Sequence, residues 1–392
     1  MATLKEESIK LPNKLIIFVA IFGLLFARTF QSFEKFPADP GYDYILLAAR
    51  SGARSWFELD PYLHLGAHVL SWFASLFPIS IQAVTLSIVI NIVWSIIGVT
   101  IFVILRHQGL SSFVSLISAF TLSLCPAAAE SSLANVGNIK WPMLVLAIIL
   151  ASSQQIFKSP IISGCYLLLT GLTNPLTAIV FLPLILNFAR CQVYERKRFL
   201  IPIICISIAL IIQIYVVGTN GITTGSGGDR TYTLWSGIGV FWLAGLFGPP
   251  TTCLLIVVLT TQLNLKSNSD FIVRLSMSGL SLSLLSYLYG GIADRYFVAP
   301  MTISWISAIL FLEGFLKNRP KAIQYSISFL SAIVFISPTV YWFNAMWFLT
   351  AGPKWADEFA AAQIQCESPV KTVFLKIGAS KIELSCSYIK NG

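Results

Sequence analysis

Acidic residues with a spacing suited to proton transfer follow the first apolar segment of the chain. Asp39 and Asp43 are four residues apart, which places both carboxylates on one helix face if Pro40 begins a helix. A carboxylate at a membrane surface can deprotonate a hydroxyl, so Asp39, and after it Asp43, are candidate general bases. With Asp60 they can also supply oxygen ligands to a divalent metal. The alternative interpretation, compatible with the first, is that Asp39 caps a short helix.

The same stretch holds further charged and ligating side chains. His64 and His68 are four residues apart, a spacing at which two imidazoles can share a metal on one helix face. The glutamate of a His-Glu-x-x-His motif is missing. The pattern therefore favours packing of an interfacial helix over a zinc site, and we predict no metal ligands here. Arg54, Asp60 and His64 are kept as candidate substrate contacts.

Two cations lie where they can meet a phosphate group. Asp294-Arg295-Tyr296 stands at the mouth of an apolar segment, and the planar fork of Arg295 matches phosphate oxygens. Lys140 opens another apolar segment beside Trp141 and can act as a second cation. These four, Asp294, Arg295, Tyr296 and Lys140, are candidate substrate-binding residues. The alternatives are a surface pair of Asp294 with Arg295 and a lysine that extends toward the lipid headgroups.

Composition places these residues in a membrane protein. Of the 392 residues, 56% are hydrophobic and 11% are charged, against about 25% charged in an ordinary soluble domain. The mean hydropathy is +0.78. A soluble enzyme, a nucleic-acid-binding module and a disulfide-stapled secreted domain are thereby excluded, and the net charge of +9 is explained by membrane topology.

The fold class that we predict is an all-α polytopic membrane protein of about eleven transmembrane helices, with interfacial helices in its external loops. At ~20 residues for each span, the apolar runs lie at 15–31, 79–105, 111–128, 141–157, 160–173, 175–190, 199–217, 235–264, 271–289, 297–316 and 322–347. The run 160–173 is short, which indicates a re-entrant segment or a kink at Asn174-Pro175. We expect Gly248-Pro249-Pro250 to break 235–264.

Charge sets the expected orientation. Basic residues gather in alternate connections, namely Arg106-His107, Lys158, 190–198, 266–274 and 317–321, which the positive-inside rule assigns to the cytoplasm. The N-terminus is then cytoplasmic and the C-terminus extracytoplasmic, in the plasma membrane. Most acids fall on the outer side with the long connections, among them 32–78. The chain is thus divided into a transmembrane domain, 1–347, and a short external tail, 348–392.

The tail holds two of the seven cysteines, Cys366 and Cys386. An oxidising exterior permits them to pair, since the other five lie in or beside predicted spans or on the cytoplasmic side. Two unpaired thiols are the alternative. Ahead of Cys366 the residue pattern is that of an amphipathic helix, and the residues between the two cysteines alternate like a strand.

The arrangement resembles the GT-C superfamily of integral membrane glycosyltransferases. The residues that carry the resemblance are Asp39-Pro-Gly-Tyr-Asp43 in the first external loop and Asp294-Arg295-Tyr296 at a late external mouth. It implies transfer of a hexosyl or pentosyl group from a polyprenyl-phosphate sugar donor to a glycan, lipid or protein acceptor, with Asp39 as catalytic residue. No nucleic acid partner is expected, and the tail lacks the large soluble domain of many members.

Two other classes of function remain as hypotheses. A lipid or glycolipid transporter or flippase should carry ionisable residues in mid-membrane. Glu313 is the only acid well inside a late apolar segment, so the pattern favours the transferase. A non-catalytic membrane scaffold is the third hypothesis, and it leaves the external acids without a role.

Overall fold

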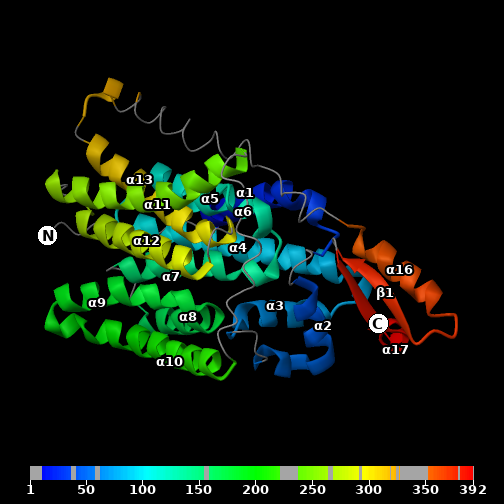
Figure 1. The fold of residues 1–392 in the computed structure, drawn as a ribbon. Helices are drawn as coiled ribbons and strands as arrows, with labels where there is room; N and C mark the ends of the chain where they lie inside the picture. The colour runs from blue at the N-terminus through cyan, green and yellow to red at the C-terminus, as the bar shows by residue number, and fades with distance from the viewer. Residues whose placement is uncertain are drawn as a thin grey trace.

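A bundle of α-helices makes up most of the computed structural model (Figure 1). The structure describes residues 11–36, 41–57, 62–153, 159–220, 237–263, 268–290, 294–317, 319–323, 326, 352–377 and 380–391. The long helices are α1 (Leu11–Thr29), α4 (Gln82–His107), α5 (Ser112–Leu124), α7 (Lys140–Ser152), α8 (Pro160–Thr173), α9 (Phe181–Arg190), α10 (Lys197–Asn220), α11 (Gly237–Gln262), α12 (Ser269–Gly290) and α13 (Val298–Leu316). Each overlaps one of the first ten predicted runs. The eleventh, 322–347, lies outside the described residues except for 322, 323 and 326.

Four helical segments within the described ranges are long and apolar enough to cross a membrane. They are Asn13–Ser32, Ile79–His107, Lys197–Thr219 and Val298–Leu316. Four shorter apolar helical segments lie at Ser112–Leu124, Val136–Ser152, Pro160–Thr173 and Pro175–Arg190. The chain therefore has apolar helices suited to a membrane, while a count of about eleven spans remains a prediction.

Of the two helix irregularities that the sequence predicts, the one at Asn174-Pro175 is present and the one at Pro249-Pro250 is absent. The chain does bend at Asn174-Pro175, where α8 ends and the 3₁₀ helix η5 (Pro175–Val180) begins; the Asn174 side chain accepts a hydrogen bond from the Leu176 N–H at 3.0 Å. The expected break at Pro249-Pro250 is wrong, because α11 runs through both prolines as one helix. Prolines are tolerated in apolar helices where neighbouring groups satisfy the freed carbonyls.

Contacts between distant segments define the two ends of the bundle. At one end, the Arg190 guanidinium and the Asp270 carboxylate are 3.1 Å apart, and the Ser111 N–H donates to the Glu313 carboxylate at 3.0 Å. We call this the basic end, because the residues around it include Arg106, His107, Arg190, Arg198, Arg274 and Lys317. The opposite end carries the C-terminal tail and the residues that follow α1.

The stretch after α1 folds into short helices at the tail end. They are η1 (Phe30–Ser32), α2 (Gly41–Ser51), η2 (Gly52–Phe57), α3 (Leu65–Ser75) and η3 (Ile79–Ile81). The remaining short elements are α6 (Ala128–Ser131), η4 (Val136–Asn138), η6 (Val193–Glu195) and η7 (Asp294–Phe297). Short helices were predicted for the first external loop, and α2 and α3 lie side by side between the tail and the bundle (Figure 1).

The tail corrects the all-α prediction. It consists of α16 (Trp355–Gln365), the strands β1 (Thr372–Ile377) and β2 (Ser380–Ser385), and α17 (Cys386–Asn391). The strands pair antiparallel, with Thr372 opposite Ser385. Every second residue of β1 is buried, which is the alternation seen in the sequence. Cys366 and Cys386 form a disulfide with Cα atoms 5.3 Å apart, as the sequence led us to expect.

Candidate active site

A hydrogen-bonded cluster of buried and half-buried side chains lies at the tail end of the bundle. Tyr44 comes from α2, Tyr62 and His64 precede α3, and Lys140 is the first residue of α7. The Lys140 Nζ donates to Tyr62 Oη at 2.7 Å and lies 3.3 Å from His64 Nε2. His64 Nε2 is 2.7 Å from Tyr62 Oη, and its Nδ1 is 2.9 Å from Tyr44 Oη. We call these four residues the polar cluster.

The protonation of His64 follows from its surroundings. Burial lowers the pKa of His64 well below its usual value, and the charges of Lys140 and His68 lower it further. The imidazole is therefore neutral near pH 7. Because an ammonium group only donates, His64 Nε2 accepts on the side of Lys140 and the Nδ1–H donates to Tyr44. His64 therefore adds no charge of its own, and Lys140 is the basic side chain of the polar cluster.

Aromatic rings enclose Lys140 and connect it to another part of the chain. The Lys140 Nζ lies 5.4 Å from the Tyr62 ring centroid and 5.3 Å from that of Trp141, within the range of cation–π attraction. Trp141 packs edge-to-face on Tyr296 of η7, with centroids 5.4 Å apart. Three predicted site residues, His64, Lys140 and Tyr296, are thus brought together from distant segments.

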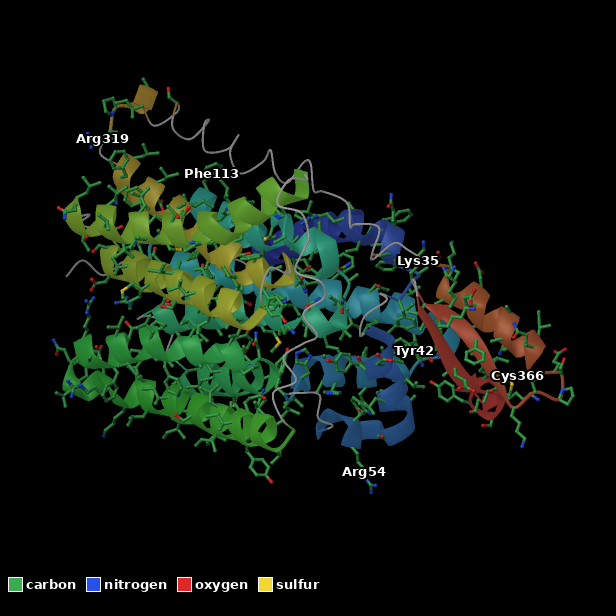
Figure 2. The ribbon with its side chains drawn as sticks, viewed as in Figure 1. Lys35, Tyr42, Arg54, Phe113, Arg319 and Cys366 are labelled. Atoms are coloured by element: carbon green, nitrogen blue, oxygen red, sulfur yellow. A yellow bond between two sulfur atoms is a disulfide. The ribbon has the colours of Figure 1, made fainter. Side chains whose placement is uncertain are left out.

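The other predicted substrate contacts have different positions. The backbone of Asp294 and Arg295 belongs to η7, directly before Tyr296, while their side chains lie outside the described parts of the chain. Asp43 is exposed in the first turn of α2. Arg54 is exposed on η2 and points away from the bundle (Figure 2). Nothing in the described contacts joins Arg54 to the polar cluster.

The predicted catalytic residue Asp39 lies outside the described residues, as does Asp60. Among the residues that are described, there is no group of three or more histidine, cysteine or acidic side chains that could hold a metal. His68 instead packs edge-to-face against Tyr44, with centroids 4.9 Å apart. The hypothesis of a metal held by oxygens of Asp39, Asp43 and Asp60 therefore stays untested.

Three aromatic rings, those of Phe36, Tyr42 and Trp355, join the tail to the residues that follow α1. Trp355, at the start of α16, lies 5.0 Å from Phe36 and 4.9 Å from Tyr42, centroid to centroid. Its Nε1–H donates to the Ile79 carbonyl at 2.6 Å, and its backbone N–H donates to the Glu34 carbonyl at 2.9 Å. The tail is therefore packed against the two described segments that flank Asp39 in the sequence.

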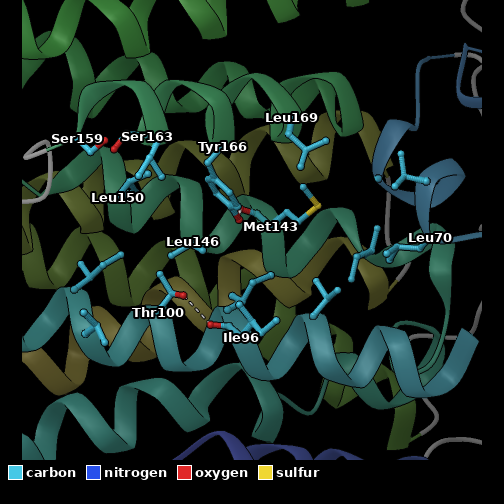
Figure 3. Close-up of a pocket in the computed structure, with 18 of the residues that line it drawn as sticks. Leu70, Ile96, Thr100, Met143, Leu146, Leu150, Ser159, Ser163, Tyr166 and Leu169 are labelled. Atoms are coloured by element: carbon cyan, nitrogen blue, oxygen red, sulfur yellow. Dashed lines mark hydrogen bonds between the residues drawn. The ribbon is translucent and has the colours of Figure 1, made fainter. Parts of the chain in front are cut away.

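An apolar cavity of about 650 Å³ begins beside the polar cluster. It lies between α4, α7 and α8, with α3 at one end (Figure 3). Gly66, two residues after His64, and Ile139, directly before Lys140, line the end near the cluster. His107 and Ser159 line the far end. The sequence analysis missed this cavity, because a void depends on how side chains of several helices pack.

Sequence analysis also missed Tyr44 and Tyr62 as members of the site. Both stand in the first external loop among other aromatic residues, a composition typical of membrane interfaces. Their useful signal was the spacing of Tyr62 two residues before His64. No family model matches the sequence, and no curated protein matches it significantly. The function must therefore be argued from the site itself.

Proposed function

We propose that the protein is a membrane glycosyltransferase that takes a sugar from a polyprenyl-phosphate carrier on the extracytoplasmic side. The observation that carries the proposal is the convergence of His64, Lys140 and Tyr296 at one end of the apolar bundle, beside the helix α2 that follows Asp39. Such a transfer needs a cation to stabilise the leaving phosphate and a carboxylate to accept a proton. Lys140 and the acids of the first external loop can supply these groups.

The reaction would proceed by direct substitution at the sugar. The acceptor hydroxyl oxygen attacks the anomeric carbon, and the bond from that carbon to the phosphate oxygen breaks. The phosphate leaves with the bonding electron pair, and the cations Lys140 and Arg295 stabilise its charge. A carboxylate of the first external loop, Asp39 in our proposal, receives the proton of the acceptor. The products are the glycosylated acceptor and the polyprenyl phosphate.

The proposed orientation has support from the ends of the bundle. The residues around Arg190 and Glu313 lie at the basic end, and the tail lies at the other end. Segregation of basic residues at one end is the pattern that the positive-inside rule associates with the cytoplasm. Labelling of single cysteines by a membrane-impermeant reagent tests the assignment. Reaction of residues 191–198 from outside the cell would contradict it.

The activity is tested with the purified protein in lipid nanodiscs. A panel of decaprenyl-phosphate hexoses and pentoses is offered with radiolabelled sugar, and release of labelled sugar to water or to added acceptors is measured. Asp39→Asn should lower the turnover by about 10²–10⁴-fold, the contribution of a general base. Asp357→Asn, the same change on the exposed first turn of α16, is the matched control and should leave the turnover unchanged.

The outcomes separate the roles. Turnover near that of the wild type in Asp39→Asn would move the base to Asp43 or Asp60. Arg295→Ala should weaken donor binding, and unchanged donor affinity would remove the phosphate role of Arg295. If no donor of the panel is bound or cleaved by the wild type, the proposed function is wrong. A separate assay uses the protein reconstituted in sealed liposomes. Transport of an intact glycolipid across the liposome membrane would instead support the flippase hypothesis.

A further inference from the structure

We propose that the cavity between α4, α7 and α8 is a binding groove for one long hydrocarbon chain of a lipid phosphate, whose phosphate group lies at the polar cluster. The inference concerns the same site as the proposed function, but it does not require sugar transfer. The residues that line the cavity and the four residues of the polar cluster all belong to the described parts of the chain. The ligand class follows from the chemistry of its walls, its length, its opening and the charge at one end.

The walls of the groove suit a hydrocarbon chain. Aliphatic side chains such as Val93, Ile97, Leu146 and Leu150 dominate the lining, and Tyr166 is the largest ring. The Tyr166 hydroxyl is already used, since it donates to the Met143 carbonyl at 2.9 Å. A cavity with such walls favours apolar occupants, because water would find few hydrogen-bond partners in it.

The groove is long enough to hold an extended stretch of a hydrocarbon chain. Its lining residues on α4 extend from Val93 to His107, and at 1.5 Å for each residue this distance is about 21 Å. The hydrocarbon core of a membrane is about 30 Å thick. The far end of the groove, lined by His107 and Ser159, lies toward the basic end of the bundle, so a chain whose head lies at the polar cluster extends from there toward the basic end. In Figure 3, Leu70 lies at one end of the groove and Ser159 at the other.

The side of the groove is open toward the surroundings of the bundle. Ile96 of α4 is 52% exposed and Ile162 of α8 is 71% exposed, although both line the cavity. Leu169, farther along α8, is 38% exposed. A lipid chain can thus enter sideways between α4 and α8 from the bilayer, which a soluble ligand in water cannot do.

The basic side chain at the end of the groove near the polar cluster selects the headgroup of the lipid. Lys140 is 7% exposed and directly follows Ile139, which lines the groove. The described contacts of Lys140 within the polar cluster are with the neutral groups Tyr62 and His64, and an ammonium has three N–H donors, so Lys140 is the group of the polar cluster that can donate a charged hydrogen bond to an anion. A phosphate at this end and a hydrocarbon chain along the groove satisfy both halves of the site.

Photolabelling tests the position of the chain. A decaprenyl phosphate analogue with a diazirine on its chain is bound to the wild-type protein in nanodiscs, irradiated and mapped by peptide mass spectrometry. We expect labels on residues 93–104 of α4 and on residues 159–169, which comprise Ser159 and the first part of α8. Labels spread evenly over α1, α10 and α11 would mean that the chain lies in the surrounding lipid, and the inference would be overturned.

Filling the groove tests the site without the label. Ser163→Phe places a ring at a buried lining position of α8, and Thr100→Phe places one at a half-buried lining position of α4. Each should weaken decaprenyl phosphate binding at least tenfold. Ile161→Phe is the matched control, because Ile161 is 63% exposed on the same helix and does not line the cavity; it should bind within twofold of the wild type. Wild-type affinity in both folded, groove-filled variants would overturn the proposal.

Four probes and two variants test the head of the lipid. Decaprenol, which lacks the phosphate, should bind at least tenfold more weakly than decaprenyl phosphate, and inorganic phosphate should not compete. Phosphatidylglycerol at equal affinity would show a general lipid site and refute the inference. Lys140→Met should lower the affinity at least tenfold, and Lys140→Arg should restore most of it. Binding at the groove without any sugar transfer would contradict the proposed function alone.

Discussion

Two buried cations of this protein have different kinds of partner, although both lie at the tail end of the bundle. Arg28, near the end of α1, is 1% exposed, and its guanidinium donates to the backbone carbonyls of Ser123 and Cys125. These carbonyls lie at the C-terminal end of α5, where a helix leaves its last carbonyls without internal partners. Lys140 instead meets the side chains of Tyr62 and His64.

The difference separates a structural cation from a candidate functional one. The described hydrogen-bond partners of Arg28 are backbone atoms that the fold already fixes, so its charge helps to hold α1 against α5. The partners of Lys140 are side chains beside an apolar cavity. Side chains can turn toward a ligand, whereas the carbonyls of a helix end cannot. We therefore expect changes at Arg28 to affect stability and changes at Lys140 to affect binding.

The largest effect is expected when Arg28 loses its charge. Arg28→Met removes charged hydrogen bonds and leaves two buried carbonyls without that donor, so the free energy of unfolding should fall by about 3–5 kcal/mol. Lys140→Met should cost no more than about 2 kcal/mol, because the hydrogen bond between Tyr62 and His64 persists. Denaturant or thermal unfolding in detergent measures both. Equal losses for the two variants would erase the distinction.

Conservative exchanges sharpen the same comparison. Arg28→Lys keeps the charge but loses the planar fork that reaches both carbonyls, and we expect a loss of about 2 kcal/mol in stability. Lys140→Arg should keep decaprenyl phosphate affinity within about threefold, since a guanidinium also binds phosphate. The two readouts are unfolding and lipid binding. A Lys140→Arg protein that unfolds like Arg28→Lys and binds no lipid would contradict a functional role for Lys140.

Acid should weaken the polar cluster. The folded state lowers the pKa of His64, so below the ordinary value of about 6.5 the unfolded chain binds a proton that the folded protein does not. The contribution of His64 to stability is therefore complete above pH 6.5, and it is lost at up to about 1.4 kcal/mol for each pH unit as the pH falls. His64→Gln should unfold with a smaller dependence on pH. An unchanged slope would disprove a neutral, buried His64.

The smallest effect is expected at Tyr62. Tyr62→Phe removes the hydroxyl between Lys140 and His64, and the ring that faces the ammonium remains. We expect a loss of about 1 kcal/mol in stability and a decrease of less than tenfold in lipid affinity. Phe36→Leu, which changes a ring of the tail contact, is a control for general loosening of this end. Lipid binding that survives Tyr62→Phe but not Lys140→Met would identify the charge as the essential feature.

The sequence predicted local structure better than it predicted the site. Apolar runs located the helices, and alternation of apolar and polar residues indicated the strands of the tail. The prediction of a helix break at Pro249 was wrong, because a proline removes only one backbone N–H donor and the helical backbone around it can persist.

Site residues were predicted singly, without their relations to one another. The prediction that Lys140 faces Arg295 stays untested, because the Arg295 side chain lies outside the described parts of the chain; the described hydrogen bonds of Lys140 go to Tyr62 and His64. Residues 62 and 140 are 78 apart in the chain, and no local pattern reports such a contact. The cavity was unpredictable for the same reason, since it depends on the relative placement of α4, α7 and α8.

The contact between Trp355 and Ile79 also has a consequence for biosynthesis. The two residues are 276 positions apart, and a ribosome adds about 5–20 residues each second. The partner of Ile79 is therefore made roughly 15–55 s after it. During this interval Phe36 and Tyr42 lack their contact with the Trp355 ring. A nascent chain that ends before residue 355 would thus lack the ring that packs on Phe36 and Tyr42 and the indole N–H that donates to the Ile79 carbonyl.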